Sequence, residues 1–219
     1  LVLDDDSGPE KGVLPAMLRA MRAGPWLGAL AANIVDPDGY SEWGSGADVA
    51  FTDEWFNLIG CGFLVRRELL ARVKGYDEAF ALYYNDLDLA LRILAEGGRI
   101  GYSRDWVVRH RKSSRSPLTP RKSRMMLQNF PLVVRSHFSG AEAFGLMAGH
   151  ACAALRAAAR GRRRAAALQG LLHGLRARPA RPHKSIPWGR PRTLFREPFA
   201  LGCLLRRALT RQPLPEPCE

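Results

Sequence analysis

The sequence predicts an α/β fold over its first half and a basic helical region after it. Between residues 1 and 110, short apolar runs bounded by turn residues alternate with segments whose apolar residues have helical spacing. Hydrophobic residues make up 47% of the 219-residue chain and charged residues 25%, so the chain can bury a core. We therefore expect one ordinary domain followed by an appendage.

Charge divides the chain at nearly the same place. Residues 1–110 hold 11 Lys/Arg and 17 Asp/Glu, a net charge of −6, whereas residues 111–219 hold 22 and 4, a net charge of +18. Nucleic acid or an anionic lipid surface is the expected partner of the basic half. The composition predicts a domain over residues 1–112 and a basic helical region over residues 113–219.

Cysteine usage and hydropathy indicate the compartment. The four cysteines, Cys61, Cys152, Cys203 and Cys218, lack the paired short spacing of a zinc site, and we interpret them as reduced structural thiols of a cytosolic protein. No signal peptide is visible, and the longest apolar run, at 143–155, is shorter than the roughly 20 residues of a membrane-spanning helix.

The first elements follow from local pattern. Residues 1–3 are apolar and predict a core strand, with an acidic loop at its end; because the chain opens on this run, we expect partner strands upstream. Residues 13–23 predict a helix that Gly24-Pro25 stops. Residues 26–35 are apolar enough for a strand, and residues 36–39 have the composition of a turn.

The next segment predicts a glycine-containing mobile loop over 44–53, a strand over 60–65 and a short helix over 67–73. A helix is expected over 86–96, with Asn85 as its cap and with Asp88 and Arg92 paired on its surface. Two strands, 99–102 and 106–108, then run into His110.

After His110 the composition changes. Residues 111–124 are polar and predict a linker, and helices are expected over 125–138, 141–160 and 165–175. The last 40 residues mix Pro and Arg around one amphipathic stretch, 199–209. Apolar faces flanked by Arg are typical of helices that lie on a membrane surface; packing against the preceding α/β domain is the alternative.

Asp4, Asp5 and Asp6 are the first residues that could carry chemistry. In an extended loop, Asp4 and Asp6 point to the same side and can approach one cation, while Asp5 points elsewhere. Carboxylates suit Mg²⁺ or Mn²⁺, which also take phosphate oxygens of a substrate as ligands. A solvated turn is the alternative interpretation.

Asp86 and His110 are the second and third candidates. A carboxylate beside a helix N-terminus is stabilised as the anion, so Asp86 either caps its helix or acts as a general base. His110, at the end of a strand, is either a structural histidine or a metal ligand.

These residues occur in a recognisable order. The acidic run 4–6 follows an apolar strand; Gly60-Cys-Gly-Phe-Leu-Val-Arg-Arg, Gly75-Tyr-Asp-Glu-Ala-Phe and Tyr84-Asn-Asp-Leu-Asp-Leu-Ala-Leu-Arg come next, and His110 ends a later strand. The set resembles the metal-binding motif, the acceptor-side block and the later metal-ligand position of family 2 GT-A glycosyltransferases. The resemblance covers about residues 1–112, roughly half of the chain.

The resemblance implies a fold and a set of roles. The fold would be the C-terminal part of a GT-A (Rossmann-like) nucleotide-sugar transferase domain, with its nucleotide-binding half upstream. Asp4, Asp6 and His110 would bind Mg²⁺ or Mn²⁺, and Asp5, on the donor side, would replace one of them if the loop is turned. Asp86 would be the catalytic base.

Four further residues are implied on the acceptor side. Trp55 and Phe56 stand where the family often places aromatic residues that contact the acceptor, with core packing as the alternative. Asp88 either orients the helix or binds an acceptor hydroxyl. Asn85 stands where an acidic residue is commoner, so it could bind a sugar hydroxyl but could not supply a charge.

The expected function is inverting, metal-assisted transfer of a sugar from a nucleotide-sugar donor to a glycan or lipid-linked acceptor of the cell envelope. The basic half would hold the enzyme on the anionic inner face of the plasma membrane. A nucleic-acid-binding module is the alternative from another class, disfavoured because no binding motif or aromatic interleaving accompanies the arginines. An inactive transferase remnant is the third possibility.

Overall fold

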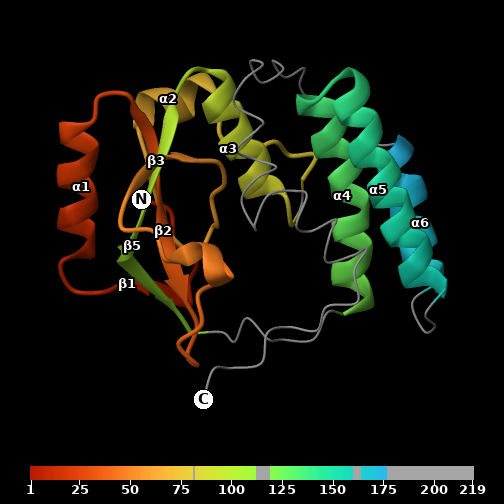
Figure 1. Ribbon diagram of the computed structural model, residues 1–219, viewed down its shortest axis with the longest axis horizontal. Coiled ribbons are helices and arrows are strands. Elements are labelled where there is room, and N and C mark those ends of the chain that lie inside the picture. The colour runs from red at the N-terminus through yellow and green to blue at the C-terminus, as the bar shows by residue number, and fades with distance from the viewer. Residues whose placement is uncertain (81, 112–118, 160–163, 177–219) are drawn as a thin grey trace.

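The computed structural model describes residues 1–80, 82–111, 119–159 and 164–176 (Figure 1). Its fold is mixed α/β, around a five-stranded sheet in the order β1-β5-β2-β4, with β3 also paired to β5. The strands are β1 (Ser7–Pro9), β2 (Leu27–Val35), β3 (Thr52–Trp55), β4 (Phe63–Val65) and β5 (Arg99–His110).

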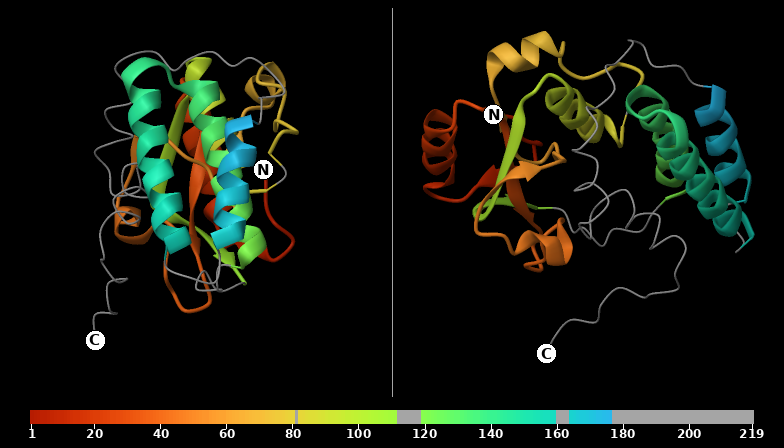
Figure 2. Two further views of the ribbon diagram at one scale, coloured as in Figure 1. Left: turned by 90° about the vertical axis from the view of Figure 1, so that its right-hand side faces the viewer. Right: turned by 45° about the horizontal axis from the view of Figure 1, so that its top comes forward.

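Helices cover both faces of the sheet. The helices are α1 (Val13–Ala23), α2 (Arg67–Arg72), α3 (Asn85–Ala95), α4 (Pro120–His137), α5 (Gly140–Ala159) and α6 (Arg164–Arg176), with a 3₁₀ helix η1 (Gly44–Ala47). Helix α1 packs on one face and α3 on the other, and α4 separates α3 from α5 and α6 (Figures 1 and 2).

The centre of the sheet is the parallel pair β2 and β5. Every residue of β2 is buried, as expected for a strand with helices on both sides. The other pairings, β1 and β3 with β5 and β4 with β2, are antiparallel. Since Val35 pairs with Arg109, the carboxyl ends of the two central strands meet at one edge of the sheet.

Two apolar clusters fix the layers. On one face, Val13, Met17 and Met21 of α1 pack with β2 residues that include Leu30 and Ile34. On the other face, the apolar residues of α3 pack with alternate β2 residues and with an aromatic group of Trp43, Trp55 and Tyr102. The alternation of β2 side chains between the clusters is the two-residue period of a strand.

Several predicted elements are confirmed. Helix α1 has the predicted bounds, and β2 begins one residue later than predicted. The strands predicted at 99–102 and 106–108 are one strand, β5, which continues through an irregularity opposite Ala31 and Asn33. The polar residues 103–105 do not interrupt it because Ser103 Oγ donates to the Ala50 carbonyl and the Asn33 amide donates to the Arg104 carbonyl.

The predicted core strand at residues 1–3 is wrong. Leu1 is 49% exposed, and only Val2 pairs, through an isolated bridge to Phe63. The strand forms after the aspartates instead, because Ser7–Pro9 runs antiparallel along the last residues of β5. The turn at residues 4–7 separates the two pairings.

The segments expected to be irregular contain regular structure. Residues 44–53 hold η1 and the start of β3, and the last residues of the predicted linker, from Pro120, belong to α4. None of the helices that the structure describes is both long and apolar enough to cross a bilayer. The amphipathic stretch 199–209 lies outside the described residues, so its membrane association stays a prediction.

Helix α5 contacts α4 beside a proline inside α4. Pro131 inside α4 has no N–H, so the carbonyl of Leu127, four residues earlier, lacks its helical partner. His150 of α5 donates from Nε2 to this carbonyl at 3.0 Å and stacks on Phe130, with ring centroids 4.6 Å apart. Burial lowers the pKa of His150, which keeps the ring neutral.

Helix α6 meets α4 through two glycines one turn apart. A Cβ on Gly170 would lie 2.7 Å from the Arg124 carbonyl oxygen, and one on Gly174 would lie 2.6 Å from that of Gln128. Both obstacles are backbone atoms, which cannot rotate away. The close approach of the two helices therefore depends on the absence of side chains at these positions.

We expect Gly174→Ala to destabilise the fold by about 1–3 kcal/mol, because the added methyl group forces α6 away from α4. Gly145→Ala in α5 is the matched control: a Cβ there meets nothing within 4 Å, so the better helix propensity of alanine should stabilise the protein by about 0.5–1 kcal/mol. Urea unfolding followed by circular dichroism measures both changes. Equal effects of the two substitutions would contradict the packing described.

Candidate functional site

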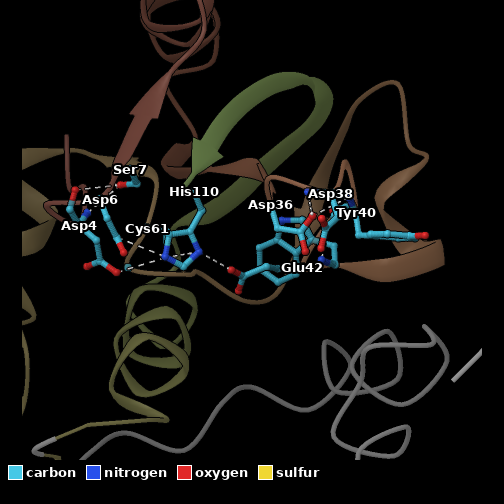
Figure 3. A network of polar contacts seen from close by, with 12 residues as sticks. Asp4, Asp6, Ser7, Asp36, Asp38, Tyr40, Glu42, Cys61 and His110 are labelled. Atoms are coloured by element: carbon cyan, nitrogen blue, oxygen red, sulfur yellow. Dashed lines mark hydrogen bonds and ion pairs between the residues drawn. The ribbon is translucent and has the colours of Figure 1, made fainter. Parts of the chain in front are cut away.

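Three backbone pairings gather side chains at the carboxyl edge of β2 and β5. The Val2–Phe63 bridge places the acidic turn beside Cys61, and Ser7 of β1 pairs with His110 at the end of β5. After β2 the chain turns back, and the Glu42 N–H donates to the Ile34 carbonyl at 2.8 Å. Residues far apart in sequence thus surround one imidazole (Figure 3).

His110 is held between carboxylates. Its Nδ1 lies 2.7 Å from Glu42 Oε1, and its Nε2 lies 3.3 Å from Asp6 Oδ1. Because the Glu42 carboxylate can only accept, the shorter contact assigns a proton to Nδ1, and Nε2 faces the aspartates. A carboxylate behind a histidine in this way orients the ring and raises its basicity as a metal ligand.

Cys61 and Asp4 complete a group that could hold a metal ion. Cys61 Sγ donates to Asp4 Oδ2 at 3.2 Å and lies 3.8 Å from each nitrogen of the His110 ring. One ligand atom from each of the three residues lies within 4.8 Å of the others. Burial, together with the hydrogen bond to Asp4, raises the pKa of the Cys61 thiol.

Two of the three residues implied as metal ligands, Asp4 and His110, belong to one group, and Asp6 contacts His110. Asp6 is outside that group, although its Oδ1 lies 3.3 Å from His110 Nε2. The loop is a turn rather than the extended segment that was expected, since the Ser7 N–H donates to the Asp4 carbonyl. Asp5 is exposed at this turn and is outside the group.

Two residues of the cluster, Cys61 and Glu42, were missed from the sequence. The wide separation of the cysteines favoured a structural role, and no pattern along the chain marks Glu42 as a neighbour of His110. Their places depend on long-range pairings. The signal that could have found Cys61 is its position between Gly60 and Gly62, where the small flanking residues allow other segments to approach.

Asp86, the predicted base, lies in the first turn of α3 with both carboxylate oxygens engaged. Tyr76 donates its hydroxyl to Oδ1 at 2.7 Å, and the Gly60 N–H donates to Oδ2 at 3.0 Å. A Cβ on Gly60 would lie 3.3 Å from Oδ1, so the glycine permits this close approach.

The surroundings of Asp86 favour its protonated form. Burial raises the pKa of the Asp86 carboxyl, the hydrogen bonds from Tyr76 and Gly60 lower it in part, and the charge of Asp4 raises it again. Asp86 and the group of Asp4, Cys61 and His110 are also linked through adjacent residues, because the Gly60 N–H donates to Asp86 and the Cys61 sulfur donates to Asp4. A carboxylate with a raised pKa beside a group of metal-ligand type is typical of a functional site.

The residues implied on the acceptor side are mostly used by the fold. Trp55 and Phe56 are 5% and 4% exposed, and Trp55 stacks on Tyr102 with ring centroids 4.2 Å apart, so core packing is their role in this structure. Asn85 is the first residue of α3 rather than its cap, since Tyr84 occupies the cap position without a side-chain hydrogen bond.

Asp88 does not lie on the surface, which corrects the expectation of an exposed pair with Arg92. Its carboxylate is completely buried and accepts from Arg92 Nη2 at 2.7 Å and from His137 Nε2 at 2.8 Å. Burial alone would raise the pKa of Asp88, but the hydrogen bond from His137 and the charge of Arg92 hold it below its usual value. Asp88 therefore anchors the helix and is out of reach of an acceptor.

The Arg92 guanidinium extends the same network to the turn before α3. Its Nη1 donates to the carbonyls of Val73 and Gly75, each at 2.5 Å. The next residue, Tyr76, holds Asp86. The buried charges thus fix the position of the hydroxyl that orients the predicted base.

The entry to α3 is strained. Tyr83 and Tyr84 both have left-handed backbone angles, with φ of 64° and 63°, a conformation that costs non-glycine residues of order 1–3 kcal/mol each. Asn129 of α4 donates its side-chain amide to the carbonyls of Leu82 and Tyr83, at 2.6 and 2.9 Å. Contacts from the helical layer therefore stabilise the turn that leads to Asp86.

Comparison with known proteins adds no family: the chain matches no protein-family model and no curated sequence.

We expect Asp88→Asn to destabilise the protein at neutral pH by about 3–5 kcal/mol, because it leaves Arg92 buried without its counter-ion. Since the pKa of Asp88 is lowered by folding, its contribution is complete above the unfolded value of about 3.9 and is lost as the pH falls below it. The difference in free energy of unfolding between wild type and Asp88→Asn should therefore become smaller at acidic pH. Urea unfolding at several pH values measures this.

Asp48→Asn is the control for this experiment. It removes an ion pair with Arg104 in which the Asp48 side chain is 79% exposed, and such pairs contribute little. We expect no measurable change in stability at neutral pH. A loss of stability as large as that caused by Asp88→Asn would contradict the larger contribution of the buried Asp88–Arg92 pair.

Proposed function

We propose that this protein is an inverting glycosyltransferase that moves a sugar from a nucleotide-sugar donor to an acceptor hydroxyl, with Asp86 as the general base. The proposal includes the finer fold assignment, the C-terminal part of a GT-A domain, and a glycan or lipid-linked acceptor. One observation carries it: Asp86 is oriented by hydrogen bonds from Tyr76 and Gly60, and the sulfur of the next residue, Cys61, donates to Asp4 in the group with His110.

Asp86 has the properties that proton abstraction needs. A general base works best when its pKa lies near the working pH, and burial moves the pKa of Asp86 upward, in that direction. Each oxygen has one donor, from Tyr76 or Gly60, and retains a lone pair for an incoming hydroxyl. Asp86 as a residue is partly exposed, and the proposal requires an acceptor hydroxyl to reach its carboxylate.

The donor set partly fits the metal that the resemblance implies. Two carboxylates, Asp4 and Asp6, and the Nε2 of His110 suit Mn²⁺, whereas Mg²⁺ prefers oxygen ligands throughout. A divalent ion at these residues would offset the negative charge that develops on the leaving nucleoside diphosphate. Cys61, the remaining member of the cluster, is not a ligand that either ion favours.

The chain's own residues then carry out the transfer. Asp86 takes the proton of the acceptor hydroxyl while the oxygen of that hydroxyl attacks the anomeric carbon of the donor sugar. The nucleoside diphosphate leaves from the opposite face, so the configuration at that carbon is inverted. Tyr76 keeps the carboxylate oriented and hydrogen-bonded during the reaction. Glu42 holds the His110 ring so that Nε2 faces the donor side.

We expect Asp86→Asn to lower turnover about 10²–10⁴-fold while leaving donor binding nearly unchanged, since the amide cannot accept the proton. Turnover is measured on the protein encoded by the full gene, which includes the expected upstream nucleotide-binding half, as release of nucleoside diphosphate from a panel of UDP- and GDP-sugars with water or a membrane glycolipid extract as acceptor. Calorimetry on the same protein measures donor binding. Asp38→Asn, in the exposed turn after β2, is the control and should keep full activity. Normal turnover of Asp86→Asn would sink the proposal.

We expect Tyr76→Phe to move the acidic limb of the kcat/KM profile to higher pH. The Tyr76 hydrogen bond lowers the pKa of Asp86, so its loss raises that pKa further and protonates the base at a higher pH. Tyr102→Phe is the control, because its hydroxyl donates to the Ala47 carbonyl in the core and does not contact Asp86. The assignment fails if the limb stays in place, or if both variants move it equally.

A further inference from the structure

We propose that Asp4, Cys61 and His110 form a binding site for a thiophilic divalent cation of the zinc class, with the Cys61 thiolate as a ligand. The site shares Asp4 and His110 with the hard-cation site of the proposed transferase and rests on that function for its consequence, which is competition between the two kinds of metal. Its existence depends only on the geometry of the three side chains.

Two of the three pairs of donor atoms lie near the spacing of tetrahedral ligands, and all three pairs are within 4.8 Å. Ligands that lie 2.0–2.3 Å from zinc at tetrahedral angles are roughly 3.3–3.6 Å from one another. Cys61 Sγ lies 3.2 Å from Asp4 Oδ2 and 3.8 Å from His110 Nε2. Shifts of a few tenths of an ångström would bring these two pairs to the coordinated spacing.

The three donors come from separate segments and are held by the fold. The Asp4 backbone is fixed by the Ser7 hydroxyl, which both accepts from its N–H and donates to its carbonyl. Glu42 fixes the His110 ring from behind. Cys61 is 6% exposed, yet its sulfur faces the carboxylate and the imidazole rather than apolar atoms alone (Figure 3).

Sulfur decides the class of metal. Thiolate ligands select zinc and other soft or borderline cations, whereas Mg²⁺ takes oxygen ligands and keeps several waters. When the cation binds, a metal–sulfur bond replaces the S–H bond of Cys61 and the proton passes to solvent. Three protein ligands leave a fourth position, which water, a phosphate oxygen or a rotated Asp6 can fill.

The test uses Co²⁺ as a spectroscopic probe for Zn²⁺ with the full chain. We expect Co²⁺ to give a thiolate charge-transfer band in the near ultraviolet, and Zn²⁺ to remove the band by displacement. Cys61→Ser should abolish the band and weaken Zn²⁺ binding at least about 100-fold, as expected for the loss of a ligand. Cys152→Ser is the matched control, because Cys152 is exposed and outside the group, and it should change neither result.

Asp4→Asn provides a second variant that the fold should tolerate, since Asp4 is exposed; it should also weaken Zn²⁺ binding. The absence of a thiolate band in the wild type, or equal Zn²⁺ affinity in Cys61→Ser and wild type, overturns the inference. Mn²⁺-supported release of nucleoside diphosphate is measured separately, on the wild-type protein encoded by the full gene. A thiolate band without release of nucleoside diphosphate rejects the transferase proposal and supports the metal site. Release of nucleoside diphosphate without a thiolate band supports the transferase proposal and rejects the metal site.

Discussion

The buried charge cluster of Asp88, Arg92 and His137 is the interaction on which the rest of the structure depends. Removing charges from water is costly, and here the cost is offset because the Asp88 carboxylate receives hydrogen bonds from both neighbours. The cluster ties together α3, the turn at residues 73–75 and the end of α4. Since Asp86 and Tyr76 lie one or two residues from these anchors, the geometry of the proposed base is set by charges that no substrate touches.

The group of Asp4, Cys61 and His110 is brought together by strand pairing in the sheet. Parallel β2 and β5 end at the same edge, and β1, β4 and the turn after β2 add the flanking groups there. The two parts meet at residues 60–61, where the Gly60 N–H binds Asp86 and the Cys61 sulfur binds Asp4. Residues 60–61 therefore connect the proposed acceptor side to the proposed donor side. Gly60 has no side chain, which lets its backbone approach the Asp86 carboxylate closely.

Local pattern was sufficient for elements whose core-facing residues are periodic, which is why α1 and β2 were predicted almost to the residue. It failed where pairing depends on distant partners: residues 7–9 are a strand only because β5 has an edge beside them. The gathering of Asp4, Asp6 and His110 was expected from a family resemblance rather than from spacing. Glu42, Cys61 and His137 were missed because nothing in their own neighbourhoods reveals what they contact across 49 residues or more.

The left-handed turn at Tyr83 and Tyr84 links helix α4 to the first turn of α3, where Asp86 lies. The energy that this turn stores is balanced by the Asn129 amide and by the Tyr84–Phe130 ring contact, both supplied by α4. Displacement of α4 would let the turn relax to ordinary backbone angles and swing the first turn of α3 with it. Helix α4 is thereby coupled mechanically to the orientation of the Asp86 carboxylate.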